Sequence, residues 1–199
     1  MNNKELSQRV RFSVPGQWKP TREQIAAAEG RRVRDIIAPG LKVLFCGINP
    51  GLYSGAVGHH FARPGNRFWP ALFASGFTER LLSPFDERAL LARGLGITNL
   101  VARATGSADV LTAEELVAGA GRLRRKVRRF RPRAVAFLGI SAYRIAFARP
   151  QVGFGRQEDL FAEAEAWLLP NPSGLNAHFQ LPELARLFEE LRTAIEDRT

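Results

Sequence analysis

Lys42-Val43-Leu44-Phe45-Cys46 is a short apolar run, and the loop sequence Gly47-Ile48-Asn49-Pro50-Gly51-Leu52 follows it directly. A short continuous apolar run that ends at glycine and proline is typical of a strand covered on both faces. Three further runs have this character, at residues 96–101, 134–138 and 166–169. The sequence therefore predicts a central sheet of about four to five strands.

Helical patterns separate these runs. Two of them open with a capping box, one from Thr21 to Gln24 and one from Thr112 to Glu115. The first predicts a helix that continues to Pro39-Gly40. The other helices are expected at residues 66–75, 87–93, 113–130, 141–147 and 182–196. Strands that alternate with helices imply right-handed crossovers, so we expect a three-layer α/β/α fold with a mainly parallel sheet.

Length and composition favour one globular domain. The chain has 199 residues, of which 45% are hydrophobic and 24% charged. Residues 1–20 are basic and lack periodicity, which predicts a mobile N-terminal arm before a single domain over residues 21–199. The formal net charge of +10 favours nucleic acid as the partner, although an anionic membrane would suit it too.

Several classes of protein are disfavoured. Cys46 is the only cysteine, which excludes an internal disulfide and a cysteine-based zinc cluster and favours a reducing compartment. No signal-peptide core or 18-residue apolar run is present, so we expect a soluble, cytoplasmic monomer without a membrane partner. His59 and His60 are adjacent and would face opposite sides, so they could not share a metal ion, and we interpret them as surface or structural residues. Nucleotide-binding motifs and metal-spaced ligands are also missing, and we expect no cofactor and no metal.

Two similar loops follow the first and the last predicted strand. They are Asn49-Pro50-Gly51 and Asn171-Pro172-Ser173-Gly174. Either loop alone could be a simple turn, because asparagine, proline and glycine all favour turns. Ligands of parallel sheets bind beyond the carboxyl ends of the strands, where both loops are expected. The pair therefore predicts one shared pocket.

Four blocks carry a family resemblance: GINPGL at 47–52, FARPGNRFW at 61–69, GITNLVARAT at 96–105 and LPNPSGLN at 169–176. With them the chain resembles the mismatch-specific uracil and thymine DNA glycosylases, a branch of the uracil-DNA glycosylase superfamily. The resemblance implies a glycosylase that flips uracil, thymine or a modified pyrimidine out of a mispair with guanine and excises it hydrolytically in base excision repair. Its partner would be double-stranded DNA with a mispaired or damaged base, or single-stranded DNA.

Cleavage of an N-glycosidic bond leaves positive charge on the sugar and negative charge on the base, so a site must position water and stabilise the anion. Asn49 matches the family's water-positioning residue, where the uracil-specific enzymes carry an aspartate; an Asx turn is the alternative. An amide orients water but is a poor base, which implies slow chemistry. Asp109 could assist the water or offset the sugar cation, but a helix N-cap or a solvated loop is the favoured interpretation. The lack of a lysine at the site implies no lyase activity.

The resemblance also assigns the base pocket. Phe61 matches the aromatic residue that stacks on the extruded base, unless it simply packs in the core. Gly51 stands where the uracil-specific enzymes have a tyrosine that blocks the thymine methyl, which implies a roomier pocket; a turn requirement explains glycine as well. Ile48 would line the pocket. Asn99 stands where some relatives carry lysine, so its role is left open.

The resemblance implies that the loop around Asn171 contacts DNA. Leu175 matches the wedge that enters the duplex, although it could instead cap the last helix. Asn171 and Ser173 would contact the backbone of the target strand, with Gly174 shaping the loop. Asn176 replaces a serine of relatives, which leaves open how guanine is read. Arg67, at the start of a helix with core aromatics, would be a positioning contact. The alternative function is a non-catalytic binder of damaged or single-stranded nucleic acid.

Overall fold

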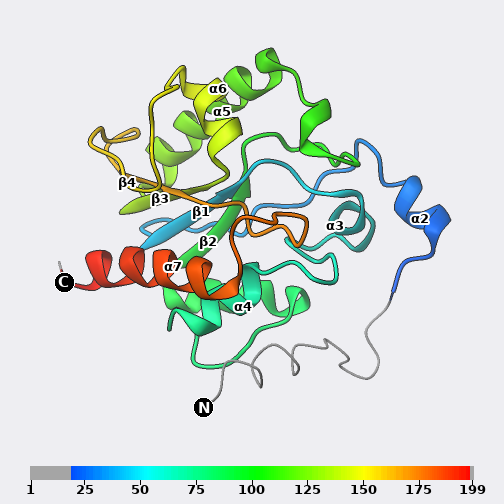
Figure 1. Ribbon diagram of the computed structural model, residues 1–199, viewed down its shortest axis with the longest axis horizontal. Helices are drawn as coiled ribbons and strands as arrows, with labels where there is room; N and C mark the ends of the chain where they lie inside the picture. Colours follow the sequence, from blue (N-terminus) through cyan, green and yellow to red (C-terminus); the bar gives the residue numbers. More distant parts are fainter. Residues whose placement is uncertain (1–18, 198–199) are drawn as a thin grey trace.

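The computed structural model describes residues 19–197, whose five strands form one sheet in the order β2-β1-β3-β5-β4 (Figure 1). The strands are β1 (Val43–Gly47), β2 (Leu95–Asn99), β3 (Ala134–Leu138), β4 (Gly155–Arg156) and β5 (Glu165–Leu169). Only β4, at the sheet edge, is antiparallel to its neighbour. The predicted mainly parallel sheet is therefore confirmed.

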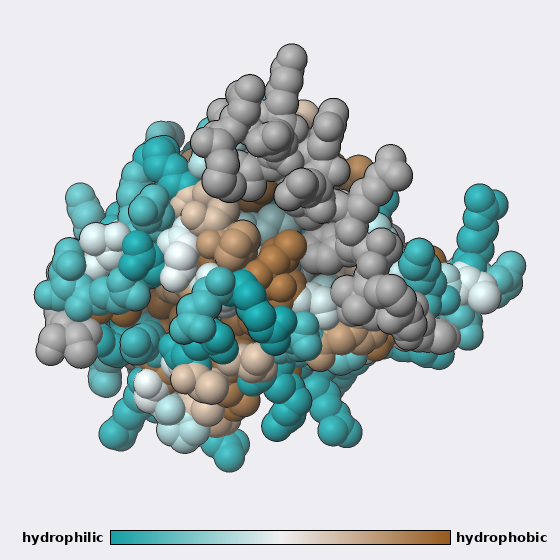
Figure 2. Space-filling view, turned by 90° about the horizontal axis from the view of Figure 1, so that it is seen from below, coloured by the Kyte–Doolittle hydropathy of each residue, from teal (hydrophilic) through white to brown (hydrophobic). Residues whose placement is uncertain are grey.

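Helices cover both faces of this sheet (Figure 1). One face carries α4 (Phe68–Ala74), the 3-10 helix η1 (Pro84–Arg93) and α7 (Leu181–Glu196), and the other carries α5 (Ala113–Phe130) and α6 (Ile140–Phe147). Phe45 points into the first core and its neighbour Leu44 into the second, which is why the strand is apolar at every position. The three-layer prediction is confirmed. Seen from the α4–α7 side, the surface is mainly hydrophilic with an apolar patch near its middle (Figure 2).

The helix expected from Thr21 to Pro39 is wrong beyond its first turns. The capping box is present and starts α2, but α2 (Arg22–Ala26) is short and the chain turns at Gly30 with a φ of 75°. Ile36 instead exchanges two backbone hydrogen bonds with Ile97 of β2, at 2.9 and 2.8 Å. This pairing buries Ile36 beside the sheet, and so it prevails over the local helical pattern.

Two more short helices, α3 (Leu52–Val57) and η2 (Ala108–Val110), lie in the connections that follow β1 and β2. The arm predicted over residues 1–20 falls almost entirely outside the described residues. Within residues 19–197, no helix is long and apolar enough to cross a membrane.

Candidate active site

The loops that follow β1, β2 and β5 meet at the carboxyl edge of the sheet. Pairing of β1 with β2 continues beyond the strands, because Val101 N donates to Ile48 O at 2.9 Å and Thr105 N donates to Pro50 O at 3.1 Å. Gly139 directly follows β3, which lies between β1 and β5, and has a φ of 137°. A Cβ on Gly139 would lie 2.8 Å from Ile48 Cδ1 and 3.9 Å from Asn171 Cβ. The two Asn-Pro loops therefore approach each other beside Gly139, which has no side chain to separate them. Their positions after parallel strands predict this approach.

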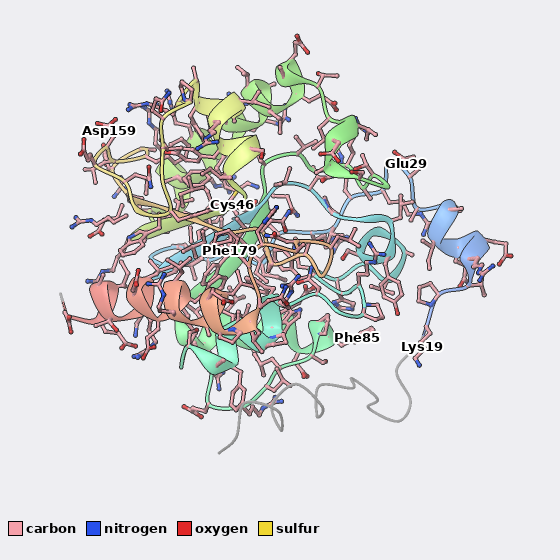
Figure 3. All side chains as sticks on the ribbon, in the orientation of Figure 1. Lys19, Glu29, Cys46, Phe85, Asp159 and Phe179 are labelled. Atoms are coloured by element: carbon pink, nitrogen blue, oxygen red, sulfur yellow. The ribbon has the colours of Figure 1, made fainter. Side chains whose placement is uncertain are left out.

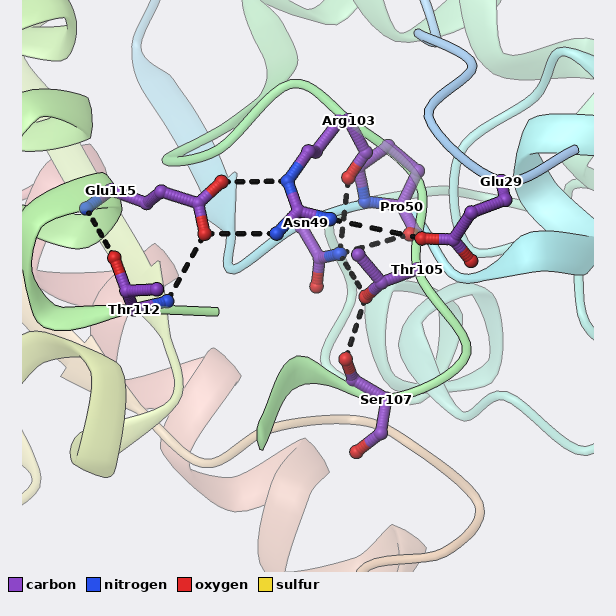
Figure 4. A network of polar contacts seen from close by, with 8 residues as sticks. All are labelled: Glu29, Asn49, Pro50, Arg103, Thr105, Ser107, Thr112 and Glu115. Atoms are coloured by element: carbon purple, nitrogen blue, oxygen red, sulfur yellow. Dashed lines mark hydrogen bonds and ion pairs between the residues drawn. The ribbon is translucent and has the colours of Figure 1, made fainter. Parts of the chain in front are cut away.

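Asn49 has a fixed amide orientation (Figure 4). Its Nδ2 donates to Pro50 O at 3.2 Å, to Arg103 O at 3.1 Å and to Thr105 Oγ1 at 2.7 Å. Carbonyl oxygens only accept hydrogen bonds, so the nitrogen must face them. The Thr105 hydroxyl donates to Ser107 O at 2.6 Å and is thereby left to accept from Asn49. Asn49 Oδ1 faces away from these acceptors and has no hydrogen-bond partner within the described residues.

The backbone that holds Asn49 is itself anchored to α5. The Arg103 guanidinium binds both carboxylate oxygens of Glu115, at 2.6 and 2.8 Å, while Glu115 also accepts from Thr112 N at 3.1 Å (Figure 4). The hydrogen bond from Arg103, together with that from Thr112, lowers the pKa of Glu115 to about 2. Glu115 therefore stays ionised at neutral pH, and the ion pair fixes the Arg103 peptide against the first turn of α5.

Phe61 and Asn99 meet at Gly47, the last residue of β1. A Cβ on Gly47 would lie 2.6 Å from Asn99 Oδ1 and 3.3 Å from Phe61 Cζ, so a side chain at this position would displace the Asn99 amide. Phe61 has a φ of 53°, and its ring stacks on Phe68 with centroids 4.1 Å apart. The ring is half-buried, and Phe68 thus supports it from the core.

A buried polar cluster supports this corner of the site. Glu87 of η1 is 5% exposed; its Oε2 accepts from His60 N and its Oε1 contacts His59 Nδ1, both at 2.9 Å. His60 is 2% exposed and contacts Asn99. No sequence pattern predicts that Glu87 belongs to this cluster, because its partners lie 27 and 28 residues away in the chain. Within residues 19–197, no group of three or more His, Cys, Asp and Glu residues could hold a metal ion.

The second Asn-Pro loop carries an exposed tip. Leu175 is 74% exposed, whereas the neighbouring polar side chains bond within the loop. Asn171 Oδ1 accepts from Ser173 N at 3.0 Å, Ser173 Oγ accepts from Leu175 N at 3.3 Å, and Asn176 Nδ2 donates to Asn171 O at 3.0 Å. These bonds give the loop a defined shape with the leucine outward, which is the exposure that a wedge needs.

Arg67 fastens this loop to the start of α4. Its guanidinium donates to Ser173 O and Asn176 O, each at 2.7 Å, and to Phe179 O. Its backbone N donates to Pro172 O at 2.8 Å. Arg67 thus holds the loop in place, because its guanidinium donates to carbonyl oxygens of the protein. A Cβ on Gly174 would lie 2.6 Å from Gly65 O, so the two loops also touch backbone to backbone.

Asp109 is an exposed residue of η2. Ser107 caps this turn: its hydroxyl accepts from Asp109 N at 3.3 Å and donates to Asp109 Oδ2 at 2.9 Å. Ser107, and not Asp109, is therefore the N-cap of η2, and the exposed Asp109 carboxylate corresponds to the solvated-loop alternative. The carboxylate is connected to Asn49 only through Ser107 and Thr105.

Cys46 lies in the middle of the molecule and plays no part in this site (Figure 3). It is buried, and burial raises the pKa of its thiol to about 12. A thiol that stays protonated is a poor nucleophile.

Known proteins resemble the chain in fold and in sequence. A solution NMR structure of a candidate uracil DNA glycosylase from Methanosarcina acetivorans superposes with a TM-score of 0.51 at 19% identity, covering 82% of this chain and 98% of that one. At this identity the match concerns the fold. The family model of the uracil DNA glycosylase superfamily matches residues 35–195, which include all the loops described above. With this match over most of its length, the chain belongs to the uracil DNA glycosylase superfamily.

Proposed function

We propose that the chain is a monofunctional, mismatch-specific DNA glycosylase that flips uracil out of a mispair with guanine and releases it by hydrolysis. Membership of the superfamily implies a hydrolase that cleaves N-glycosidic bonds in DNA during base excision repair. The observation that carries the finer proposal is the orientation of Asn49, whose Nδ2 is engaged by three acceptors while Oδ1 is free.

The chemistry follows from that orientation. Asn49 Oδ1 accepts a hydrogen bond from a water molecule and directs the water oxygen toward the anomeric carbon. The bond from this carbon to the base breaks, its electron pair leaves with the base, and the water oxygen forms the new bond to the sugar. The water proton passes to solvent, because a neutral amide cannot keep it. Asn49 thus supplies orientation without general-base strength, so the chemical step is slow.

The pocket is built to accept more than uracil. Phe61 would stack on the extruded base, and this contact is indifferent to base identity. Gly51 is the N-cap of α3, and no atom lies within 4 Å of a Cβ placed on it, so the space beside it is open. Ile48 packs against Gly139 at the adjoining edge. These features support a permissive pocket that also admits thymine or a modified pyrimidine.

The DNA contacts are assigned to the second loop. Leu175 would fill the gap that the flipped base leaves, with Asn171, Ser173, Gly174 and Asn176 along the backbone of the duplex. Arg67 would act as a positioning residue that holds the loop in place. Asp109 would assist the water as a secondary group, since its Oδ2 is engaged by Ser107 and only Ser107 and Thr105 connect it to Asn49.

The test is single-turnover release of uracil from a G·U duplex in the presence of a chelator, beside A·U, G·T, single-stranded uracil and an etheno adduct. We expect release to be fastest from G·U and almost absent for Asn49→Ala, which should still bind the duplex. Equal rates on G·U and A·U would overturn mismatch specificity. Tight binding by the wild-type protein without turnover, unchanged in Asn49→Ala, would instead identify a non-catalytic binder.

A further inference from the structure

His60 lies beside Asn99 in this site, and its polar atoms are all engaged in hydrogen bonds. Its backbone N donates to Glu87 Oε2 at 2.9 Å, and its backbone O accepts from Trp69 Nε1 at 3.2 Å. Its ring Nε2 lies 2.9 Å from Arg34 O and its ring Nδ1 lies 3.3 Å from Asn99 Nδ2. All four polar atoms of the residue have partners, and the side chain is 2% exposed.

These contacts determine the tautomer. The Arg34 carbonyl oxygen can only accept, so the hydrogen of the ring lies on Nε2. Desolvation by burial lowers the pKa of His60, although the charges of Glu87 and Asp35 oppose this, so the ring is neutral and Nδ1 carries only a lone pair. Asn99 must then turn its nitrogen toward His60, since an amide oxygen in that place would face another acceptor.

The remaining atom of the amide is thereby aimed at the base pocket. Asn99 Oδ1 lies over the end of β1, 2.6 Å from the position of a Cβ on Gly47. Phe61 Cζ lies 3.3 Å from that same position. The oxygen therefore stands beside the ring on which the extruded base would stack, and it offers a hydrogen-bond acceptor there.

We propose that His60, held by Glu87, is a specificity-determining positioning residue that locks the Asn99 amide with its oxygen toward the extruded base. The inference rests on the proposed function. A base with a ring N–H at its pairing edge, such as uracil or thymine, donates to this oxygen, whereas the N3 lone pair of cytosine is repelled by it. The buried histidine thus selects imide-type bases without touching them.

Two isosteric substitutions separate the two ring nitrogens. His60→Gln keeps a donor for Arg34 O but has no acceptor at the Nδ1 position, whereas His60→Asn keeps an acceptor for Asn99 and loses the contact to Arg34. The assay is single-turnover release of 5-fluorouracil and 5-fluorocytosine, each opposite an abasic-site analogue so that neither base is paired. We expect His60→Gln to reduce the rate ratio of the two bases about tenfold, the size of one neutral hydrogen bond. His60→Asn should stay within about threefold of the wild-type ratio.

A double-variant comparison tests whether His60 acts through Asn99. The double variant of His60→Gln with Asn99→Ala should discriminate as poorly as Asn99→Ala alone. An unchanged ratio in His60→Gln, or losses that multiply in the double variant, would overturn the proposal. Circular dichroism of each variant checks that the fold is retained.

A measurement on the wild-type protein is independent of both folding of the variants and turnover. Nitrogen-15 NMR of the histidine rings, without DNA, should show the His60 hydrogen on Nε2 and a bare Nδ1 across the pH range of the assay. A hydrogen on Nδ1 would overturn the proposed lock. If the wild-type protein releases neither base, the proposed function fails, and the NMR result alone then decides whether His60 orients Asn99.

Discussion

Replacing Asn49 by aspartate changes one nitrogen into an oxygen and is the sharpest test of the amide orientation. The uracil-specific enzymes have a similar loop that carries an aspartate at the position of Asn49. The resemblance alone therefore suggests that Asn49→Asp supplies a stronger base and makes the enzyme faster. The structure predicts a different result. The new oxygen would face Pro50 O and Arg103 O, which now accept hydrogen bonds at 3.2 and 3.1 Å.

The size of the effect follows from those contacts. The amide has two hydrogens for three acceptors, so two hydrogen bonds are lost, which lowers the free energy of unfolding by about 1–3 kcal/mol. Thr105 Oγ1 can donate to the new oxygen only by leaving Ser107 O. The two facing carbonyls disfavour the carboxylate and raise the pKa of the new carboxyl above its ordinary value of about 3.9, at about 1.4 kcal/mol for each pKa unit. The folded variant therefore holds its proton more tightly than the unfolded chain does.

The sign of the pH dependence is then fixed. A raised pKa in the folded state means that stability is lost as the pH rises from the unfolded value to the folded one. Urea unfolding of Asn49→Asp and wild type, at about pH 4 and about pH 8, should give a stability deficit that is larger at the higher pH. A variant as stable as wild type at both pH values, and faster in releasing uracil, would refute the assigned orientation.

Three further outcomes are expected. Thr105→Val removes one acceptor of Asn49 without changing shape, so single-turnover release should fall about tenfold while affinity for the duplex is unchanged; an unaltered rate would contradict its role. Gly174→Ala places a Cβ 2.6 Å from Gly65 O and should weaken binding of the lesion duplex, whereas the control Gly121→Ala, with no atom within 4 Å, should bind normally. Because burial lowers the pKa of His60, the unfolded chain binds its proton more readily, and stability should fall as the pH drops below about 6.5. Urea unfolding should show a smaller fall for His60→Gln, and equal falls would argue against this.

The strands could be predicted from the sequence because they are buried on both faces. The long first helix was predicted wrongly because its second half pairs with a strand that is distant in the chain. β3 occupies residues 134–138 as expected, because a strand between two helical layers is apolar at every position. The helix predicted from Thr21 fails because Ile36 bonds to Ile97, 61 positions away in the chain. No local pattern carries that information.

The same distinction applies to the site. Asn49 and Asn171 each follow a parallel strand, and parallel strands present their carboxyl ends at one edge of the sheet. The sequence therefore predicts that both residues lie at that edge. Thr105 belongs to the block at residues 96–105 that carries the family resemblance. Its contact with Asn49, 56 residues earlier in the chain, could not be predicted from that block. The contacts of His60 with Asn99 and of Glu87 with His60 could not be predicted for the same reason, because folding brings together partners that lie far apart in the chain.

The most direct test of the central claim is uracil release and DNA binding measured on one G·U duplex with wild type and Asn49→Ala. We expect wild type to release uracil and leave an abasic site, and Asn49→Ala to bind the duplex with similar affinity and release almost nothing. Equal release by the two proteins, or no release by wild type on a duplex that it binds, would contradict it.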